Sequence, residues 1–189
     1  MASHKSRTIG RSFRINEHWL TALSEEAERS GISPNALLNK ILQEYFEYLR
    51  YSKRYGVITL SQKSFSSIID ACPKEALIET AKKAGSVIAR DAFRMAGLRN
   101  SYENTIQYVT KTLGDYGNWF KCDHYIINNR EYFHLRHTLG EKWSIYVSEA
   151  VSTFLESCCQ KKVKKEFLED AVTLELSSSP YLNGEKQKE

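Results

Sequence analysis

The chain lacks the features that mark a secreted or membrane-spanning protein. Its four cysteines have neither zinc-finger nor CxxC spacing, so we expect reduced thiols rather than a disulfide framework. No apolar run approaches the ~18 residues that span a membrane. The opening MASHKSRTIG has no apolar segment of the length a signal peptide needs. These absences predict a cytoplasmic protein without a membrane partner.

The common catalytic motifs are also missing. There is no Gly-rich phosphate loop, no GxSxG and no HExxH. We therefore expect that the protein is not an enzyme, and no cofactor is favoured.

Acidic residues are absent from residues 1–14, which contain Lys5, Arg7, Arg11 and Arg14. The formal net charge of the whole chain is +4, so the remaining residues sum to about zero. A basic arm before a neutral body is typical of proteins with an anionic partner such as nucleic acid. The alternative is a disordered leader that only adds solubility.

A folded core is expected from what the chain does contain. It has 189 residues, of which 41% are apolar and 26% charged, which suits one ordinary domain or two small ones.

The first fifty residues predict a strand, a helix, a tight turn and a second helix. RSFRIN, residues 11–16, alternates polar and apolar side chains as a strand does. Asn16 is a good N-cap for a helix that Gly31 ends. Ser33 and Pro34 fit the start of a second helix. The apolar face of the first helix comprises Trp19, Leu20, Leu23 and Ala27.

A lone short strand leaves its backbone groups without partners. The second helix also has an apolar surface wider than the first helix can cover. Pairing with the same segment of a second chain resolves both problems, so we expect a homodimer with an intermolecular two-stranded ribbon.

This arrangement is similar to the ribbon–helix–helix DNA-binding domain of the Arc/MetJ type, over residues 8–50. The resemblance is carried by RSFRIN-EHWLTALSEEAERSGISPNALLNKILQEYF, with its basic strand, polar cap, Gly-Ile-Ser turn and two helices. It implies that the paired strands lie in the major groove of double-stranded DNA. A higher oligomer on DNA is left open.

Under this resemblance, strand alternation points Phe13 and Ile15 into the helical core. Arg11 falls on the inward side, and we expect it to reach past the strand end toward a phosphate. The free amides at the start of the second helix attract phosphate, although Ser33 also fits simple capping. The expected base contacts are Gly10, Ser12 and Arg14, and the expected phosphate contacts are Lys5, Arg7, Arg11, Ser33 and Asn35.

The rest of the chain predicts an α+β domain with a mainly antiparallel sheet. Residues 57–60 are expected to form a strand, and a hairpin is expected to turn near Asn128-Asn129. An amphipathic helix and a last strand follow. KKVKK, residues 161–165, is expected to be a solvated loop, with a phosphate contact as the alternative. The predicted divisions are a basic arm (1–7), a ribbon–helix–helix domain (8–54), an α+β sensor or oligomerisation domain (55–176) and a disordered tail (177–189).

The hairpin also concentrates potential metal ligands. A two-residue turn at 128–129 places Cys122, His124 and His137 on one face and His134 on the other. A thiolate and two imidazoles suit a transition metal. The alternative, which we favour, is that these side chains belong to a core.

Three functions follow from these patterns. The first is a dimeric DNA-binding transcription regulator, such as a repressor, whose second domain senses a ligand, oligomerises or binds a partner. The second is an antitoxin-like or partner-binding protein that also binds DNA. The third is a metal-responsive regulator that uses the Cys/His set. The sequence identifies neither the effector nor the operator.

Overall fold

The computed structural model describes residues 9–177. The predicted contacts of Lys5 and Arg7 and the predicted disorder beyond residue 177 lie outside the described residues. The chain divides into two compact units between Glu47 and Tyr48, inside the helical run that follows Pro34.

The first unit contains two helices joined by a tight turn. Asn16 caps α1 by accepting the His18 amide at 3.0 Å, and Ser33 caps α2 by accepting the Ala36 amide at 3.1 Å. Gly31 makes the turn with a φ of +64°. These predicted caps and this turn are confirmed. The bounds are α1 Glu17–Arg29 and α2 Pro34–Glu44.

Residues 9–16 form no strand in the single chain. A strand is defined by pairing, and no other described segment pairs with this one. The ribbon therefore stays a prediction about two chains.

The helices of the second unit include two π-helical stretches, each continuous with a neighbouring α-helix. They run α3 Arg50–Tyr55, α4 Gln62–Ala71, α5 Lys74–Lys83, η2 Ala84–Ile88, α6 Ala89–Met95, α7 Tyr102–Gln107, η3 Tyr108–Tyr116 and α8 Gly140–Cys159. The π-helical η1, Tyr45–Leu49, joins α2 to α3.

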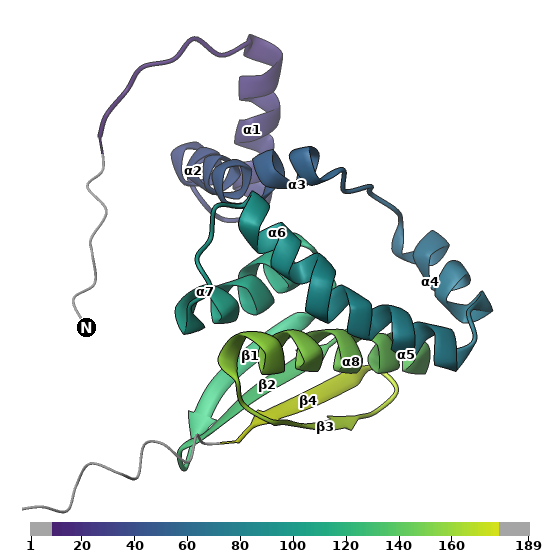
Figure 1. Ribbon diagram of the computed structural model, residues 1–189. Helices are drawn as coiled ribbons and strands as arrows, with labels where there is room; N and C mark the ends of the chain where they lie inside the picture. Colours follow the sequence, from purple (N-terminus) through teal and green to yellow (C-terminus); the bar gives the residue numbers. More distant parts are fainter. Residues whose placement is uncertain (1–8, 178–189) are drawn as a thin grey trace, which may run out of the picture. The chain divides into compact units, whose positions relative to one another are not determined.

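The second unit has α+β architecture with a four-stranded antiparallel sheet, as predicted. The strand order is β1-β2-β4-β3, and α8 packs on one face of the sheet (Figure 1). The predicted turn at Asn128-Asn129 is confirmed: both residues have positive φ, and Cys122 faces Leu135. The strands are β1 Lys121–Ile127, β2 Arg130–Arg136, β3 Val163–Phe167 and β4 Ala171–Leu176.

Two local predictions were wrong. Residues 57–61 are not a strand, and Ile58 is 77% exposed, because no described strand lies beside them to complete a ladder. KKVKK is not a simple solvated loop. Its last residues enter β3, because pairing with β4 satisfies their backbone whatever the charge of their side chains.

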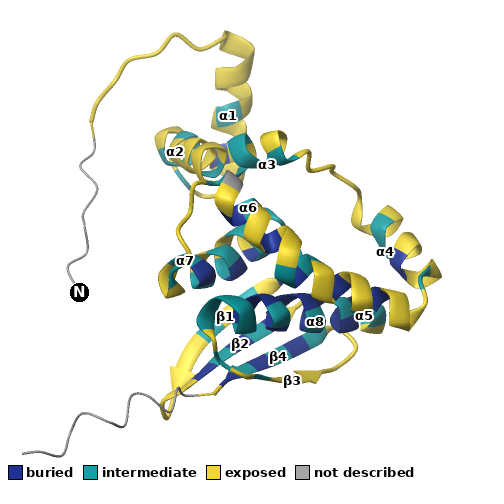
Figure 2. Cartoon of the chain, viewed as in Figure 1, coloured by how far each residue is buried: buried dark blue, intermediate teal, exposed yellow. Residues whose placement is uncertain are grey.

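The helix α8 is the centre of the second unit. Its buried residues pack against the sheet below and against α5 and η2 above (Figure 2), and a half-buried stripe with Tyr146, Glu149 and Thr153 runs between them. This central layer includes Trp143, Val147, Val151, Phe154 and Leu155.

Close approach between α8 and η2 depends on Gly85. A Cβ built on Gly85 would overlap the Ala150 carbonyl oxygen and lie 2.9 Å from Thr153 Cβ. The residues one helical turn before and after Gly85 also have small side chains, and both Ala81 and Ala89 are buried. The absence of a side chain at position 85 therefore sets the spacing of the two helices.

We predict that Gly85→Ala destabilises the protein by about 1–3 kcal/mol, since the added methyl overlaps backbone atoms that cannot rotate away. Within a helix this substitution ordinarily stabilises by about 1 kcal/mol, so the sign itself is diagnostic. Urea unfolding measures it. Val87→Ala, at an exposed position two residues on, is the control. If Gly85→Ala stabilised the protein, or changed its stability only as much as Val87→Ala does, that result would contradict the packing argument.

Candidate nucleic-acid interface

The predicted base-contacting residues lie together on one exposed segment before α1. Gly10, Ser12 and Arg14 are all exposed, as is Arg11. No acidic residue occurs before Glu17. The segment therefore presents cations and a hydroxyl group to solvent without any carboxylate that could neutralise them.

Ser33 and Asn35 lie at the start of α2, as predicted. The Ser33 hydroxyl is used in capping, and the Asn35 carbonyl accepts from the Asn39 side chain at 2.8 Å. Both residues are exposed, so the first turn of α2 remains open to an anion.

The described part of the first unit has almost no core of its own. Ala27 is its one buried residue. Phe13 is 72% and Trp19 68% exposed, although both belong to the apolar pattern that predicted a covered face. Further exposed apolar side chains in this unit are Ile15, Leu20, Ile41, Leu42 and Tyr45.

The candidate metal ligands of the hairpin are engaged in other interactions. Burial raises the pKa of the Cys122 thiol to about 12, which disfavours a thiolate. His124 Nε2 lies 2.8 Å from Glu131, and His137 Nε2 lies 2.9 Å from the Ser144 hydroxyl. Within residues 9–177, no group of three or more His, Cys, Asp or Glu side chains is placed to hold a metal ion. The structure does not bring the three candidates together as ligands.

Glu131 is a buried acid that the sequence reasoning missed. Its side chain is 6% exposed; it accepts a hydrogen bond from the Tyr102 hydroxyl and lies 3.9 Å from Lys161 Nζ. Burial and the carboxylate together raise the pKa of Tyr102. Strand alternation could have predicted this burial, because Glu131 lies on the same inward face of β2 as Phe133 and Leu135.

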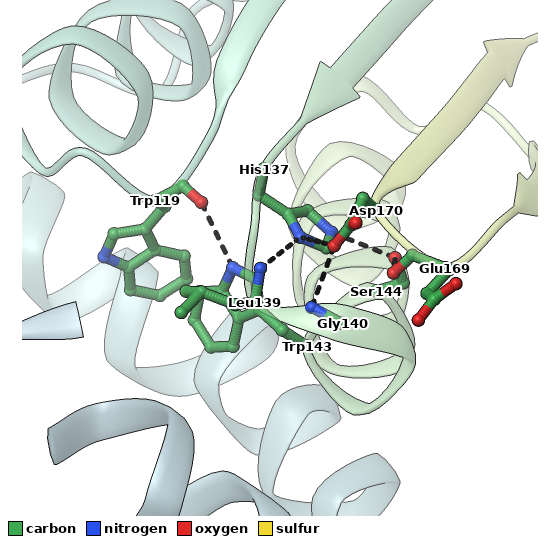
Figure 3. Close-up of polar contacts among 8 residues, drawn as sticks. All are labelled: Trp119, His137, Leu139, Gly140, Trp143, Ser144, Glu169 and Asp170. Atoms are coloured by element: carbon green, nitrogen blue, oxygen red, sulfur yellow. Dashed lines mark hydrogen bonds and ion pairs between the residues drawn. The ribbon is translucent and has the colours of Figure 1, made fainter. Parts of the chain in front are cut away.

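His137 lies just beyond β2 and joins three segments of the chain (Figure 3). Its side chain is 2% exposed. The Leu139 amide donates to its Nδ1 at 3.3 Å, and its Nε2 contacts Ser144 on α8. Asp170, in the β3–β4 turn, lies 3.7 Å from Nδ1 and accepts the Gly140 amide at 2.9 Å. The start of α8 is thereby tied to this turn.

Ser144, His137 and Asp170 are the residue types of a hydrolytic triad, but their hydrogen bonds run the wrong way. Nδ1 accepts from a backbone amide, so the proton of the neutral ring must be on Nε2. Nε2 then donates to Ser144, whose own proton goes to the Glu169 carbonyl at 3.0 Å. A catalytic base would instead accept from the serine. Ser144 is fully buried, so the group holds the fold together.

Comparison with known proteins adds no identification. The chain matches no protein-family model, and no similar protein was found among curated proteins or solved structures. In the part of the chain that the structure describes, no helix has both the length and the apolar character needed to cross a membrane.

We predict that the fold becomes less stable in mild acid because of His137. Burial lowers the pKa of His137, although Asp170 partly opposes this. The unfolded chain therefore takes up the proton first as the pH falls. The free energy of unfolding is therefore unaffected by His137 above about pH 6.5 and falls progressively below this pH. Thermal unfolding between about pH 8 and 5 should show a smaller pH dependence for His137→Gln than for the native protein.

The control for this experiment is His18→Gln, on exposed α1. It should retain the full pH dependence of the native protein. If His137→Gln retained it too, the acid sensitivity would have another source.

Proposed function

We propose that this protein is a dimeric, sequence-specific DNA-binding transcription regulator of the ribbon–helix–helix type. Residues 9–15 of two chains would pair as an antiparallel ribbon that enters the major groove. The second unit would sense a ligand, oligomerise the dimers or bind a partner.

The observation that carries this proposal is the uncovered apolar surface of the first unit. Phe13, Trp19 and Ile41 are exposed in a unit with almost no buried residues. Two helices of this length have little stability without tertiary packing. A second copy supplies a core for the same faces, because an isologous interface buries the same patch on both chains.

The basic segment supports the assignment of DNA as the partner. Once Phe13 and Ile15 enter the shared core, Ser12 and Arg14 remain on the outer face of the ribbon, doubled by the dimer. Arginine can bond two acceptors of guanine in the major groove. Arg11 and the first turn of α2, with Ser33 and Asn35, are suited to phosphate contacts that fix the register.

The proposal assigns no catalytic role to the second unit. Its triad-like residues are hydrogen-bonded for structure, and its hairpin histidines pair with Glu131 and Ser144.

We predict that the protein binds duplex DNA selected from a random pool, with an affinity that falls steeply as salt rises because phosphate contacts release counterions. Arg14→Ala should lose ~1–3 kcal/mol of discrimination at one base pair of each half-site. Gel shift or fluorescence anisotropy over a salt series measures both effects.

Arg29→Ala is the matched control, since Arg29 is an exposed arginine paired with Glu26 at the end of α1. It should leave sequence preference unchanged. Absence of duplex binding at low salt would refute the proposal. An unchanged preference in Arg14→Ala would remove only Arg14 from the reading face.

We predict that Ile41→Asp dissociates the dimer, because the charge would be buried without a partner in the shared core. Ile68→Asp provides a comparison, since both isoleucines lie on helices and are about half exposed in the single chain. Changes at exposed sites ordinarily cost less than about 0.5 kcal/mol. Sedimentation equilibrium should therefore show monomer for the first variant and native assembly for the second. Equal behaviour would place the interface elsewhere.

A further inference from the structure

A hollow of about 350 Å³ lies between α4 and the loop that joins β2 to α8. One wall is a single face of α4, and the other is formed by Thr138 and Leu139. This volume is at the lower end of the range for small-molecule pockets, about 300–1,000 Å³. The wall residues of α4 are Gln62, Lys63, Ser66 and Ser67.

The chemistry of this lining is cationic and rich in hydrogen-bond donors. Lys63 contributes an ammonium group, Gln62 an amide and Thr138 a hydroxyl, while the hydroxyls of Ser66 and Ser67 donate to Asp70 and to the Lys63 carbonyl. None of the lining residues is acidic. Lys63 makes no ion pair with any residue in the range 9–177.

Both walls are held in place by interactions outside the hollow. Phe65 packs edge-to-face on Trp143 with ring centroids 4.9 Å apart. Lys142 donates to the carbonyl of Cys72, just after α4, at 2.7 Å. On the other side, the Leu139 amide is fixed by the buried His137 ring. The two walls of the hollow are therefore supported without a ligand.

We propose that this hollow binds a small phosphoryl-bearing molecule, with its phosphate against Lys63 and the hydroxyl of Thr138. A phosphate offers several acceptor oxygens and negative charge, which matches one ammonium group together with an amide and a hydroxyl donor. The inference does not depend on DNA binding, since it uses other residues of the chain.

Asp70 is an acidic group close to this site on the same helix as Lys63. It lies one turn beyond Ser66 on α4 and accepts a long hydrogen bond of 3.4 Å from that hydroxyl. Its charge opposes an anion in the hollow, so removing the charge should strengthen binding. Opposite effects of changing Lys63 and Asp70 would therefore report on the charge of the ligand.

The test is a titration of the full chain with inorganic phosphate at constant pH and ionic strength, followed by residue-resolved NMR. We expect saturable shifts at the amides of residues 62–67 and 138–139. Lys63→Gln should weaken binding at least about tenfold, the order expected for loss of a charge-assisted hydrogen bond. Asp70→Asn should strengthen it.

Lys111→Gln is the matched control, since Lys111 is an exposed lysine paired with Asp115 on another helix. It should bind phosphate as the native chain does, and unchanged thermal unfolding shows that each variant is folded. Arg14→Ala separates this site from the DNA surface, because it should leave the shifts at 62–67 intact.

Several results would overturn the proposal. They are the absence of saturable shifts at residues 62–67 and 138–139, equal phosphate affinity of Lys63→Gln and the native chain, and acetate binding as tight as that of phosphate. Shifts confined to residues 9–16 and 33–36 also count against it, and they would place phosphate on the proposed DNA surface instead.

Discussion

The second unit depends on one helix that is covered on two sides. α8 can occupy the middle of the structure because its buried residues, which include Trp143, Val151 and Leu155, are apolar or small. A sheet covers one side, and the helix that contains Gly85 approaches the other side closely. The His137 cluster fixes where α8 begins. The hairpin, the β3–β4 turn and α4 are each positioned by contact with this helix.

The first unit shows the opposite distribution of apolar surface. Its helices are well capped and correctly joined, but their apolar faces are largely open. Secondary structure alone does not stabilise so short a unit, because burial provides most of the favourable free energy. Dimerisation and DNA reading are therefore coupled in our proposal. The pairing that covers Phe13 is the same event that turns Arg14 outward.

Local features of the fold were predictable, while features that depend on distant partners were not. Helix caps at Asn16 and Ser33 and the turn at Asn128-Asn129 follow from side-chain and backbone preferences within a few residues. The strand predicted at 57–60 failed because a strand exists only beside another strand. β3 was not predicted for the same reason. Its sequence is highly charged, and only pairing of its backbone with β4 makes it a strand.

The sequence by itself determined the helices, their caps, the hairpin register and the basic segment without acidic residues. These properties depend on residues that are close together in the sequence, so sequence patterns predict them. Only the tertiary structure decided how the polar groups pair. His137 meets Ser144 and Asp170, and Glu131 meets Tyr102, through contacts between separate elements. Those contacts fix the tautomer of the histidine and place a carboxylate out of water, and neither can be read from spacing along the chain.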